Sequence, residues 1–560
     1  MRLIDQIADR YVDESIKLSP GLATFLGVPG FEDKIDDLSP AGLAAQADLD
    51  RRTLDELRST EPCDEREQVA KEAMTERLEL ALERYEAGDA HLSLNVLGSG
   101  VHGVRQLFDI MNIEDAEGAA NVVARLNAVP VAFEQYADTL RSEASAGRVA
   151  ARRQVTEVAS HCDNWNGASG DDFWAGLIKR VTVDGEPPTG ELAAALEEGA
   201  QAARAATATF AEFLRNELAP VAPEKDAVGR DRYARASRYF LGAAVDLEET
   251  YAWGWEELHR IETEMARVAD RIKSGADVDE AVAVLDADPE QTLPDKDAFR
   301  DWMQELADAT IADMADTHFD IPEPVRRIEC MIAPTSDGAI YYTGPSEDFT
   351  RPGRMWWSVP PEQETFSKWR EVTTVYHEGV PGHHLQVGQS AYRSELLNRY
   401  QRQLLWCSGH GEGWALYSER LMEELGYLDD PAIRLGMLDA QAFRATRVIV
   451  DIGVHLELEI PADNPFGFAP GQVWTPELAW DFLRAHCRIE DKMLQFELNR
   501  YLGWPGQAPS YKVGERIWMA ARDEYKERKG EAFNLKQFHT DALNLGSLGL
   551  EPFQAALKRI

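Results

Sequence analysis

The sequence contains few cysteines and no long hydrophobic run, and each absence excludes a class of protein. The five cysteines in 560 residues are scattered, odd in number and without C-x-x-C spacing. This pattern argues against a disulfide framework and a zinc ribbon, and it favours a reducing compartment. No apolar run approaches the length of a transmembrane helix, and the N-terminal segment lacks the apolar core of a secretion signal. We therefore expect a cytoplasmic protein.

Basic residues are also scarce relative to acidic ones. The chain has 58 Lys and Arg against 98 Asp and Glu, which gives a formal net charge of −40. A chain with this excess of acidic residues lacks the basic surface with which proteins bind nucleic acids. An anionic membrane surface would repel it. We expect neither partner. Highly charged, solvated helix faces explain the acidity most simply, and the composition leaves the oligomeric state open.

The first half of the chain has the pattern of consecutive helices. Hydrophobic residues make up 44% of the sequence, with 14 Trp and 20 Phe, so a large core can form. No period of 20 to 50 residues recurs, which excludes a solenoid. The helices that periodicity and capping residues predict here cover residues 2–18, 40–60, 65–87, 191–218, 230–272 and 297–317.

The pattern changes near residue 321. Short runs of β-branched and aromatic residues predict strands at 325–332, 339–342 and 355–359, with turns at 334–338 and 351–353. The helices predicted after this small sheet cover residues 364–378, 434–458, 475–502, 514–529 and 535–543, with an irregular loop at 503–512. We divide the chain into an N-terminal helical region, 1–320, and a second region, 321–560. Together they are expected to form one continuous, mostly α-helical fold.

A histidine cluster lies at the end of the predicted helix 364–378. The segment V-Y-H-E-G-V-P-G-H-H-L-Q places His377, Glu378, His383 and His384 within eight residues of a chain with only twelve histidines. Imidazoles beside a carboxylate are what a catalytic zinc site requires. On a regular helix, however, six residues correspond to roughly 600° of rotation and about 9 Å of rise. The rings of His377 and His383 could not then reach one ion.

Pro381 and Gly382 offer a solution. Proline removes a helical hydrogen-bond donor, and glycine permits unusual dihedral angles. We therefore predict that the helix bulges or breaks at 380–382, which would bring His383 back toward His377. His384 remains an alternative to His383 as the ligand.

The next motif, G-E-G-W-A-L-Y-S-E, supplies a third ligand. Glu412 follows His383 by 29 residues, enough for a loop and a second helix. Glu419 lies seven residues later and shares a helix face with Glu412. We predict Glu412 as the ligand and Glu419 as the residue that orients a histidine.

Two further groups of residues could have a functional role or a purely structural one. Tyr341 and Tyr342 lie on a predicted strand just before the metal-binding helix. That strand could pair with a substrate backbone, or it could be a purely structural hairpin. Arg447, Asp451 and His455 recur at every fourth position, and this spacing alone favours a simple ion pair on a solvated face.

Four motifs together resemble a known family. H-E-G-V-P-G-H-H-L-Q, E-G-W-A-L-Y-S-E, R-V-I-V-D-I-G-V-H and P-G-Q-A-P-S-Y-K-V-G occur in this order, and the similarity spans nearly the whole chain. They are similar to the bacterial domain of unknown function 885 family. That family resembles the gluzincin metallopeptidases, in particular the mostly helical thimet-oligopeptidase-like and carboxypeptidase-Taq-like enzymes.

The resemblance implies a two-lobed, zincin-like body with a deep groove. It favours His383 over His384 as ligand, with His384 in a supporting role, and it favours Glu412 as the third ligand. It also implies that Arg447, Asp451 and His455 line the groove and that Tyr511 donates to the oxyanion. Residues 457–472 depart from the family pattern as an insertion, so the family's preference for substrate size need not transfer.

The predicted function is that of a zinc-dependent hydrolase of short peptides, similar to a carboxypeptidase or an oligopeptidase. Glu378 would act as the base, and Tyr511 or His455 would stabilise the oxyanion. Arg447 or Lys512 could bind a terminal carboxylate. Two alternatives remain: a non-catalytic metal- or peptide-binding protein, and an amidohydrolase acting on a small non-peptide amide.

Overall fold

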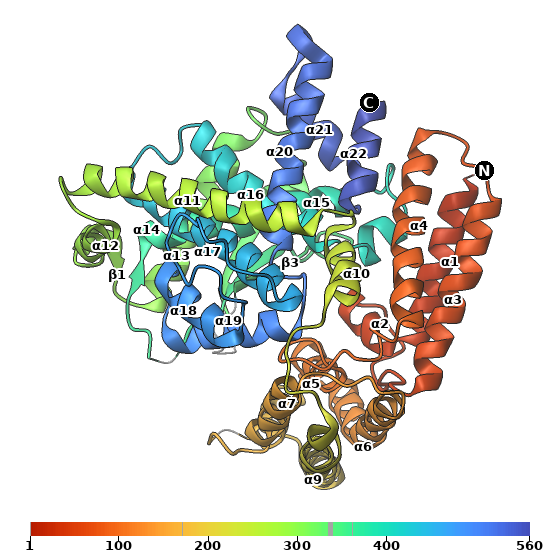
Figure 1. Ribbon diagram of the computed structural model, residues 1–560. Helices are drawn as coiled ribbons and strands as arrows, with labels where there is room; N and C mark the ends of the chain where they lie inside the picture. The colour runs from red at the N-terminus through yellow and green to blue at the C-terminus, as the bar shows by residue number, and fades with distance from the viewer. Residues whose placement is uncertain (1, 171, 334–339, 361) are drawn as a thin grey trace. The chain divides into compact units, whose positions relative to one another are not determined.

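The computed structural model describes residues 2–170, 172–333, 340–360 and 362–560. Contacts within the chain divide it into two compact units. The first comprises Met1–Pro62, Leu78–Ala227 and Leu502–Trp504, and the second comprises Cys63–Arg77, Val228–Tyr501 and Pro505–Ile560. The division predicted at residue 320 falls inside the second unit, because α11 (Leu247–Ile272) packs along α17 (Pro431–Leu456) (Figure 1).

The first unit consists of helices joined by loops, with no named strand among its described residues. Its core consists of apolar side chains from α5 to α9, among them Leu126, Phe133 and Phe210. The π-helix η1 (Leu214–Leu218) and the 3-10 turn η2 (Ala219–Val221) follow the last of these helices. The helices of the unit are α1 (Leu3–Leu18), α2 (Pro20–Leu26), α3 (Pro40–Ser59), α5 (Gly100–Ile110), α6 (Ala116–Ser145), α7 (Arg152–Trp165), α8 (Phe173–Arg180) and α9 (Gly190–Phe213), together with part of α4 (Glu65–Glu86).

The second unit contains all the residues predicted to form the site. Besides α11 and α17, its helices are α10 (Arg230–Leu241), α12 (Val278–Asp286), α13 (Lys296–Met314), α14 (Lys368–Glu378), α15 (His383–Tyr392), α16 (Ser408–Glu424), α18 (Pro476–His486), α19 (Asp491–Gly503), α20 (Ser510–Lys529), α21 (Leu535–Leu543) and α22 (Leu550–Arg559). Short 3-10 or π turns lie at Pro289–Gln291, Glu323–Arg326, Tyr400–Leu404 and Gly530–Ala532. The mostly α-helical fold is confirmed. Within the described part of the chain, no helix is long and apolar enough to cross a membrane.

Two of the predicted long helices are each divided in the structure. The helix expected at 230–272 ends first at Gly242, which adopts a left-handed conformation with φ 61°. A Cβ there would lie 2.2 Å from the Cα of Gly549, so the chain turns where only glycine fits. The helix expected at 475–502 is interrupted between α18 and α19. Periodicity alone did not indicate either break.

A small mixed sheet precedes α14, as predicted. Its order is β2 (Ile328–Ile332), β4 (Gly353–Trp357) and β3 (Ile340–Thr343). Strand β4 pairs in parallel with β2 and antiparallel with β3, which makes β3 an outer strand. A second pair joins β1 (Thr292–Leu293) to β5 (Phe366–Ser367), directly before α14. The turn predicted at 334–338 lies outside the described residues.

Helices α16 and α20 cross at a row of glycines. A Cβ on Gly413 would lie 2.5 Å from the carbonyl carbon of Gly514, and one on Gly514 would lie 2.1 Å from the carbonyl oxygen of Gly409. The two backbones therefore approach each other as only glycine allows. This crossing carries Tyr511 and Lys512 to the helix that bears Glu412. Both lie in the first turn of α20, and the loop predicted at 503–512 is correspondingly shorter.

Residues 457–472, predicted as an insertion, form a loop after α17. Its aromatic side chains Phe466 and Phe468 pack against Phe482, and Phe468 also stacks on Trp474. The loop is thus held by an aromatic cluster of its own. Its influence on substrate size stays a prediction.

A buried histidine on α21 supports the helix that carries Glu412. The Nε2 atom of His539 lies 2.8 Å from the Tyr417 hydroxyl of α16, and its ring stacks on Phe319. Burial lowers the pKa of His539 to about 3. The unfolded chain, with an ordinary histidine pKa near 6.5, therefore binds a proton that the folded chain excludes. The contribution of His539 to stability is complete above about pH 6.5 and is lost as the pH falls toward 3.

We therefore expect the free energy of unfolding of the natural chain to fall more steeply with acidification than that of a His539→Gln variant. Between pH 7 and pH 5 the difference should reach about 2 kcal/mol. Urea unfolding at each pH measures it, with His259→Gln, at an exposed position, as the control. Parallel pH profiles for the natural chain and His539→Gln would contradict the assignment.

Candidate metal centre

The predicted helix break is confirmed at the histidine cluster. Helix α14 ends at Glu378 and α15 begins at His383, with a cis peptide bond between Val380 and Pro381. A Cβ on Gly382 would lie 1.9 Å from the carbonyl oxygen of His377, so the chain folds back more tightly than any other residue permits. The Trp414 indole of α16 donates to the carbonyl oxygens of Pro381 and Gly382, at 2.8 and 3.2 Å. Two buried carbonyl groups of the break thus have their hydrogen bonds supplied by the helix that carries Glu412.

This fold-back brings His377, His383 and Glu412 together. One ligand atom from each lies within 4.8 Å of the others. The Nε2 atoms of His377 and His383 are each 3.3 Å from Glu412 Oε2. Tetrahedral ligands about 2.0–2.2 Å from a zinc ion lie about 3.3–3.6 Å apart. The donor set and the two distances to Glu412 therefore fit a zinc ion, and three protein ligands would leave one coordination position for a water molecule or a substrate.

The charges around the cluster favour a cation. Burial by itself would raise the pKa of Glu412, but His383 and His377 outweigh it and hold that pKa well below its usual range. Burial would lower the pKa of His377, but Glu412 and Glu419 outweigh it and raise the pKa to about 10. Glu419 Oε1 lies 2.8 Å from His377 Nδ1. This is the position predicted for Glu419, because the bond orients the imidazole with Nε2 toward Glu412.

The pKa of Glu378 is shifted upward, whereas the pKa values of Glu412 and Glu419 are shifted downward. Its side chain is buried, and Oε2 has no hydrogen-bond partner among the described residues. Burial raises the pKa of Glu378 above its usual value, although His383 and His377 partly offset the effect. A carboxylate that is poorly solvated and lacks a partner on one oxygen is a stronger base than an exposed one.

The structure brings His383, and not His384, to the cluster. The Nε2 atom of His384 lies 2.8 Å from the Val325 carbonyl oxygen, and its Nδ1 atom lies 2.9 Å from the Tyr342 hydroxyl. Both nitrogens are therefore engaged, and burial lowers the pKa of His384 to about 4. His384 ties α15 to the sheet, and the hydroxyl of Tyr342 is engaged in the same contact.

Tyr511 lies between the ligand cluster and two arginines. Burial raises the pKa of its hydroxyl, and the negative charge of Glu412 raises it further. Arg500, Arg447 and Gln507 act in the opposite direction. The guanidinium carbon of Arg447 is 5.0 Å from the centre of the Tyr511 ring. A phenol in this position can donate a hydrogen bond toward the cluster.

His455 and Asp451 are buried and contact other residues of the second unit, so their place beside the ligands stays a prediction. His455 Nε2 lies 3.0 Å from the Tyr501 carbonyl oxygen, and burial lowers the pKa of this imidazole to about 4. Asp451 Oδ2 accepts hydrogen bonds from the Tyr233 hydroxyl and the Gly506 amide. One nitrogen of His455 is thus engaged by the backbone, and its proposed contact with an oxyanion stays a prediction.

The two basic residues predicted to bind substrate are both buried, but they differ in their partners. Lys512 is 2% exposed, and its ammonium contacts Gln441, Glu515 and Glu257. These partners occupy the group, so the prediction that Lys512 binds a carboxylate is not supported. Arg447 shares the single carboxylate of Glu497 with Arg500, at 3.0 and 2.9 Å. One positive charge therefore remains in excess beside Tyr511.

Several residues of the site have no signal in the sequence pattern. The Trp406 indole is 49% exposed, and its ring centre lies 5.9 Å from that of His383. Arg500 reaches Tyr511 from α19, and Gln441 donates to Glu419 Oε2 at 3.3 Å. Trp414, which donates to the helix break, differs from these three residues because it lies within the motif G-E-G-W-A-L-Y-S-E. The others are brought to the site by packing between distant segments.

Comparisons with known proteins identify relatives without a stated activity. A protein-family model described as "Bacterial protein of unknown function (DUF885)" matches residues 20–557. No curated protein matches the chain.

Two solved structures have a similar fold. One, described as a "putative lipoprotein" from Colwellia psychrerythraea, has 20% sequence identity and a TM-score of 0.83, and the match covers 100% of this chain and 98% of that one. The other, described as a "putative lipoprotein of unknown function" from Shewanella oneidensis, has 17% identity and a TM-score of 0.73, with 99% of each chain covered. At these identities the likeness concerns the fold alone.

Proposed function

The chain belongs to the family of bacterial proteins of unknown function DUF885, and from this premise we propose that it is a zinc-dependent peptidase acting on short peptides. The observation that carries the proposal is the convergence of His377, His383 and Glu412, with the buried carboxylate of Glu378 adjacent in sequence to the first ligand. The resemblance of the motifs to the gluzincin metallopeptidases supports the same chemistry.

The chain's own residues can perform the proton transfers of peptide hydrolysis. Zinc, when bound by the two histidines and Glu412, supplies a Lewis acid that polarises a carbonyl group and lowers the pKa of water. Glu378 accepts the proton of the attacking water and passes it to the leaving amine. Tyr511 donates a hydrogen bond to the oxygen on which negative charge develops. Glu419 keeps His377 in the orientation that this arrangement needs.

Two features support a peptide as the substrate. The excess positive charge of Arg447 and Arg500 beside Tyr511 can attract a terminal carboxylate. Strand β3 is an outer strand of the sheet that precedes α14, and its Tyr341 is 39% exposed. An outer strand next to a metal-binding helix can pair with the backbone of an extended peptide.

The proposal is tested by the zinc content of the purified protein together with its action on a library of short peptides. We expect close to one zinc ion per chain, and cleavage products detectable by mass spectrometry. His377→Ala should lose both the metal and the activity. Absence of zinc even after reconstitution would refute the proposal. Zinc binding without cleavage of any peptide would favour the amidohydrolase or the non-catalytic binding protein, and a screen of small amides would separate these two.

The same library separates two modes of cleavage if each peptide is present as a free acid and as a C-terminal amide. If Arg447 and Arg500 bind the terminal carboxylate, the free acids should be cleaved at least about 10-fold faster, because a charged hydrogen-bonded contact is lost in the amide. Equal rates would point to an oligopeptidase that does not read the end of the chain.

Cellular location is a separate proposal. The cysteine pattern favours the cytoplasm, whereas both similar structures are described as lipoproteins. Fractionation of the source cells decides between a cytoplasmic and a membrane-associated protein.

A further inference from the structure

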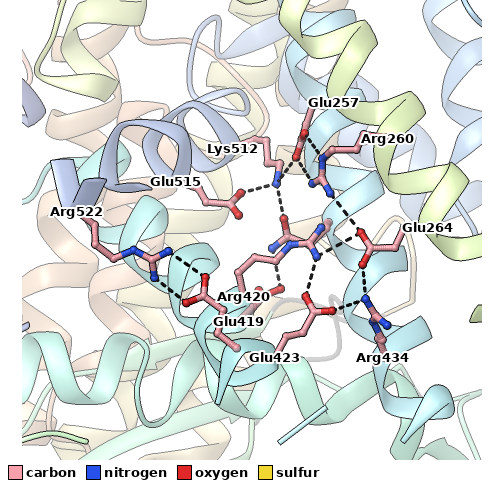
Figure 2. Close-up of polar contacts among 12 residues, drawn as sticks. Glu257, Arg260, Glu264, Glu419, Arg420, Glu423, Arg434, Lys512, Glu515 and Arg522 are labelled. Atoms are coloured by element: carbon pink, nitrogen blue, oxygen red, sulfur yellow. Dashed lines mark hydrogen bonds and ion pairs between the residues drawn. The ribbon is translucent and has the colours of Figure 1, made fainter. Parts of the chain in front are cut away.

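Lys512 connects the candidate metal centre to a helix that supplies none of its ligands. The residue lies in the first turn of α20, and its Nζ atom is 2.5 Å from Gln441 Oε1 on α17 and 3.0 Å from Glu257 Oε1 on α11. Glu515, one turn along α20, is its third partner. Figure 2 shows the ammonium group between the carboxylates of Glu257 and Glu515. Such a buried lysine is neutralised by its partners and is closed to substrate.

From Gln441 the contacts continue to a predicted metal ligand. The Nε2 atom of Gln441 donates to Glu419 Oε2 at 3.3 Å, and Glu419 Oε1 lies 2.8 Å from His377 Nδ1. Lys512, Gln441, Glu419 and His377 are all buried. Four helices, α20, α17, α16 and α14, each contribute one residue to this chain of contacts.

The direction of these hydrogen bonds depends on Lys512. A glutamine amide has one accepting end and one donating end, and an ammonium group can only donate. Lys512 therefore holds the Gln441 oxygen on its own side and turns the NH₂ group toward Glu419. Without the ammonium group the amide could reverse and place its oxygen against the Glu419 carboxylate. That carboxylate would then lose a donor and its fixed position beside His377.

We propose that Lys512 is a positioning residue, which orients the Gln441 amide so that Glu419 holds His377 in the geometry that binds zinc. This inference rests on the proposed function, because it concerns the same metal. It replaces the predicted substrate contact of Lys512 with a role inside the protein.

A purely structural role is the competing explanation. Glu257 also pairs with Arg260, which continues to Glu264, and Glu264 pairs with Arg434 (Figure 2). In that interpretation Lys512 only fastens α20 to this ion-pair network on α11. Removing it would then lower stability without changing the metal site, so the two explanations differ in their effect on zinc.

The test compares Lys512→Met and Gln441→Met with the full-length natural chain. Zinc affinity is measured by competition with a chelator, and the visible absorption spectrum of the cobalt-substituted protein reports the ligand geometry. We expect each variant to bind zinc about 10- to 100-fold more weakly, as for other groups that support a metal-binding histidine. The cobalt bands should shift in both variants. The double variant should lose no more than either single one, because both residues act through one contact chain.

The matched control is Arg522→Met, which removes an ion pair between α20 and Glu424 of α16 but does not touch Gln441. It should keep the zinc affinity of the natural chain even if its melting temperature falls.

Gln441→Met leaves Lys512 and its two carboxylates in place, so it tests the proposal even where Lys512→Met does not fold. Natural affinity and an unshifted cobalt spectrum in folded Gln441→Met would overturn the proposal. If the natural chain cleaves peptides with zinc bound and the variants bind zinc equally well, this inference alone fails. If the natural chain binds no zinc, the proposed function fails first.

Discussion

A Glu378→Gln variant is expected to bind zinc as the natural chain does, but to hydrolyse peptides about 10³-fold more slowly. Glutamine has nearly the shape of glutamate but cannot accept the proton of the attacking water. Proton transfer by a positioned base contributes about 10²- to 10⁴-fold to the rate. Burial raises the pKa of Glu378 and makes it a stronger base, so its removal should cost more than the lower end of this range. The rate at which the variant cleaves a peptide substrate of the natural chain checks the loss of activity. The zinc content of the same preparation checks that metal binding is unchanged.

The matched control is Glu371→Gln, two helical turns earlier on α14. It removes a carboxylate from the same helix without touching the ligand cluster, so we expect most of the activity to remain. Full activity in Glu378→Gln would show that another group accepts the proton and would refute the mechanism. Loss of zinc from Glu378→Gln would instead show that Glu378 is part of the metal-binding site.

A Gly382→Ala variant should lose zinc and activity together, although it alters no ligand. The added methyl group would lie 1.9 Å from the carbonyl oxygen of His377 and 2.5 Å from that of Tyr376. Both are backbone atoms of α14, so no side chain can move aside to make room. The segment between α14 and α15 must open, which carries His383 away from His377. We expect zinc affinity to fall by at least about 100-fold, corresponding to about 2.7 kcal/mol.

Gly103→Ala provides the comparison, because a Cβ at that helical position meets nothing within 4 Å. Alanine is a better helix former than glycine, so this variant should be as stable as the natural chain or slightly more stable. Circular dichroism confirms that both variants fold, and chelator competition compares their zinc affinities. A Gly382→Ala protein with unchanged affinity would mean that the fold-back does not hold the ligands in place.

The two variants separate chemistry from architecture. Glu378→Gln removes the base and keeps the metal, whereas Gly382→Ala keeps every functional group and disturbs only the backbone that assembles them. If both variants behave as predicted, the ligands, the base Glu378 and the fold-back at Gly382 have the roles proposed for them.

The parts of the site that depend on neighbouring residues could be predicted from the amino-acid sequence. His377, Glu378, Pro381, Gly382 and His383 lie within seven positions, and the physical chemistry of proline and glycine is local. The break at 380–382 could therefore be predicted before any tertiary contact was known. The second motif is equally compact, so Glu412 and Glu419 could be assigned from helix geometry. The mostly helical fold and the small sheet before α14 followed from periodicity in the same way.

The contacts of residues whose partners lie far along the chain became known from the three-dimensional fold. Lys512 meets Gln441 across 71 positions, and His455 meets Tyr501 across 46. Spacing along one helix showed that Arg447, Asp451 and His455 share a face, but not which helix covers that face. It could not show that the covering segments bury His455 against Tyr501 and enclose Lys512. Packing between distant helices sets these contacts, because the choice of neighbour depends on how many apolar faces are buried at once. Local spacing therefore indicated the candidate ligands, with His384 as an alternative to His383, and the fold as a whole placed the residues around them.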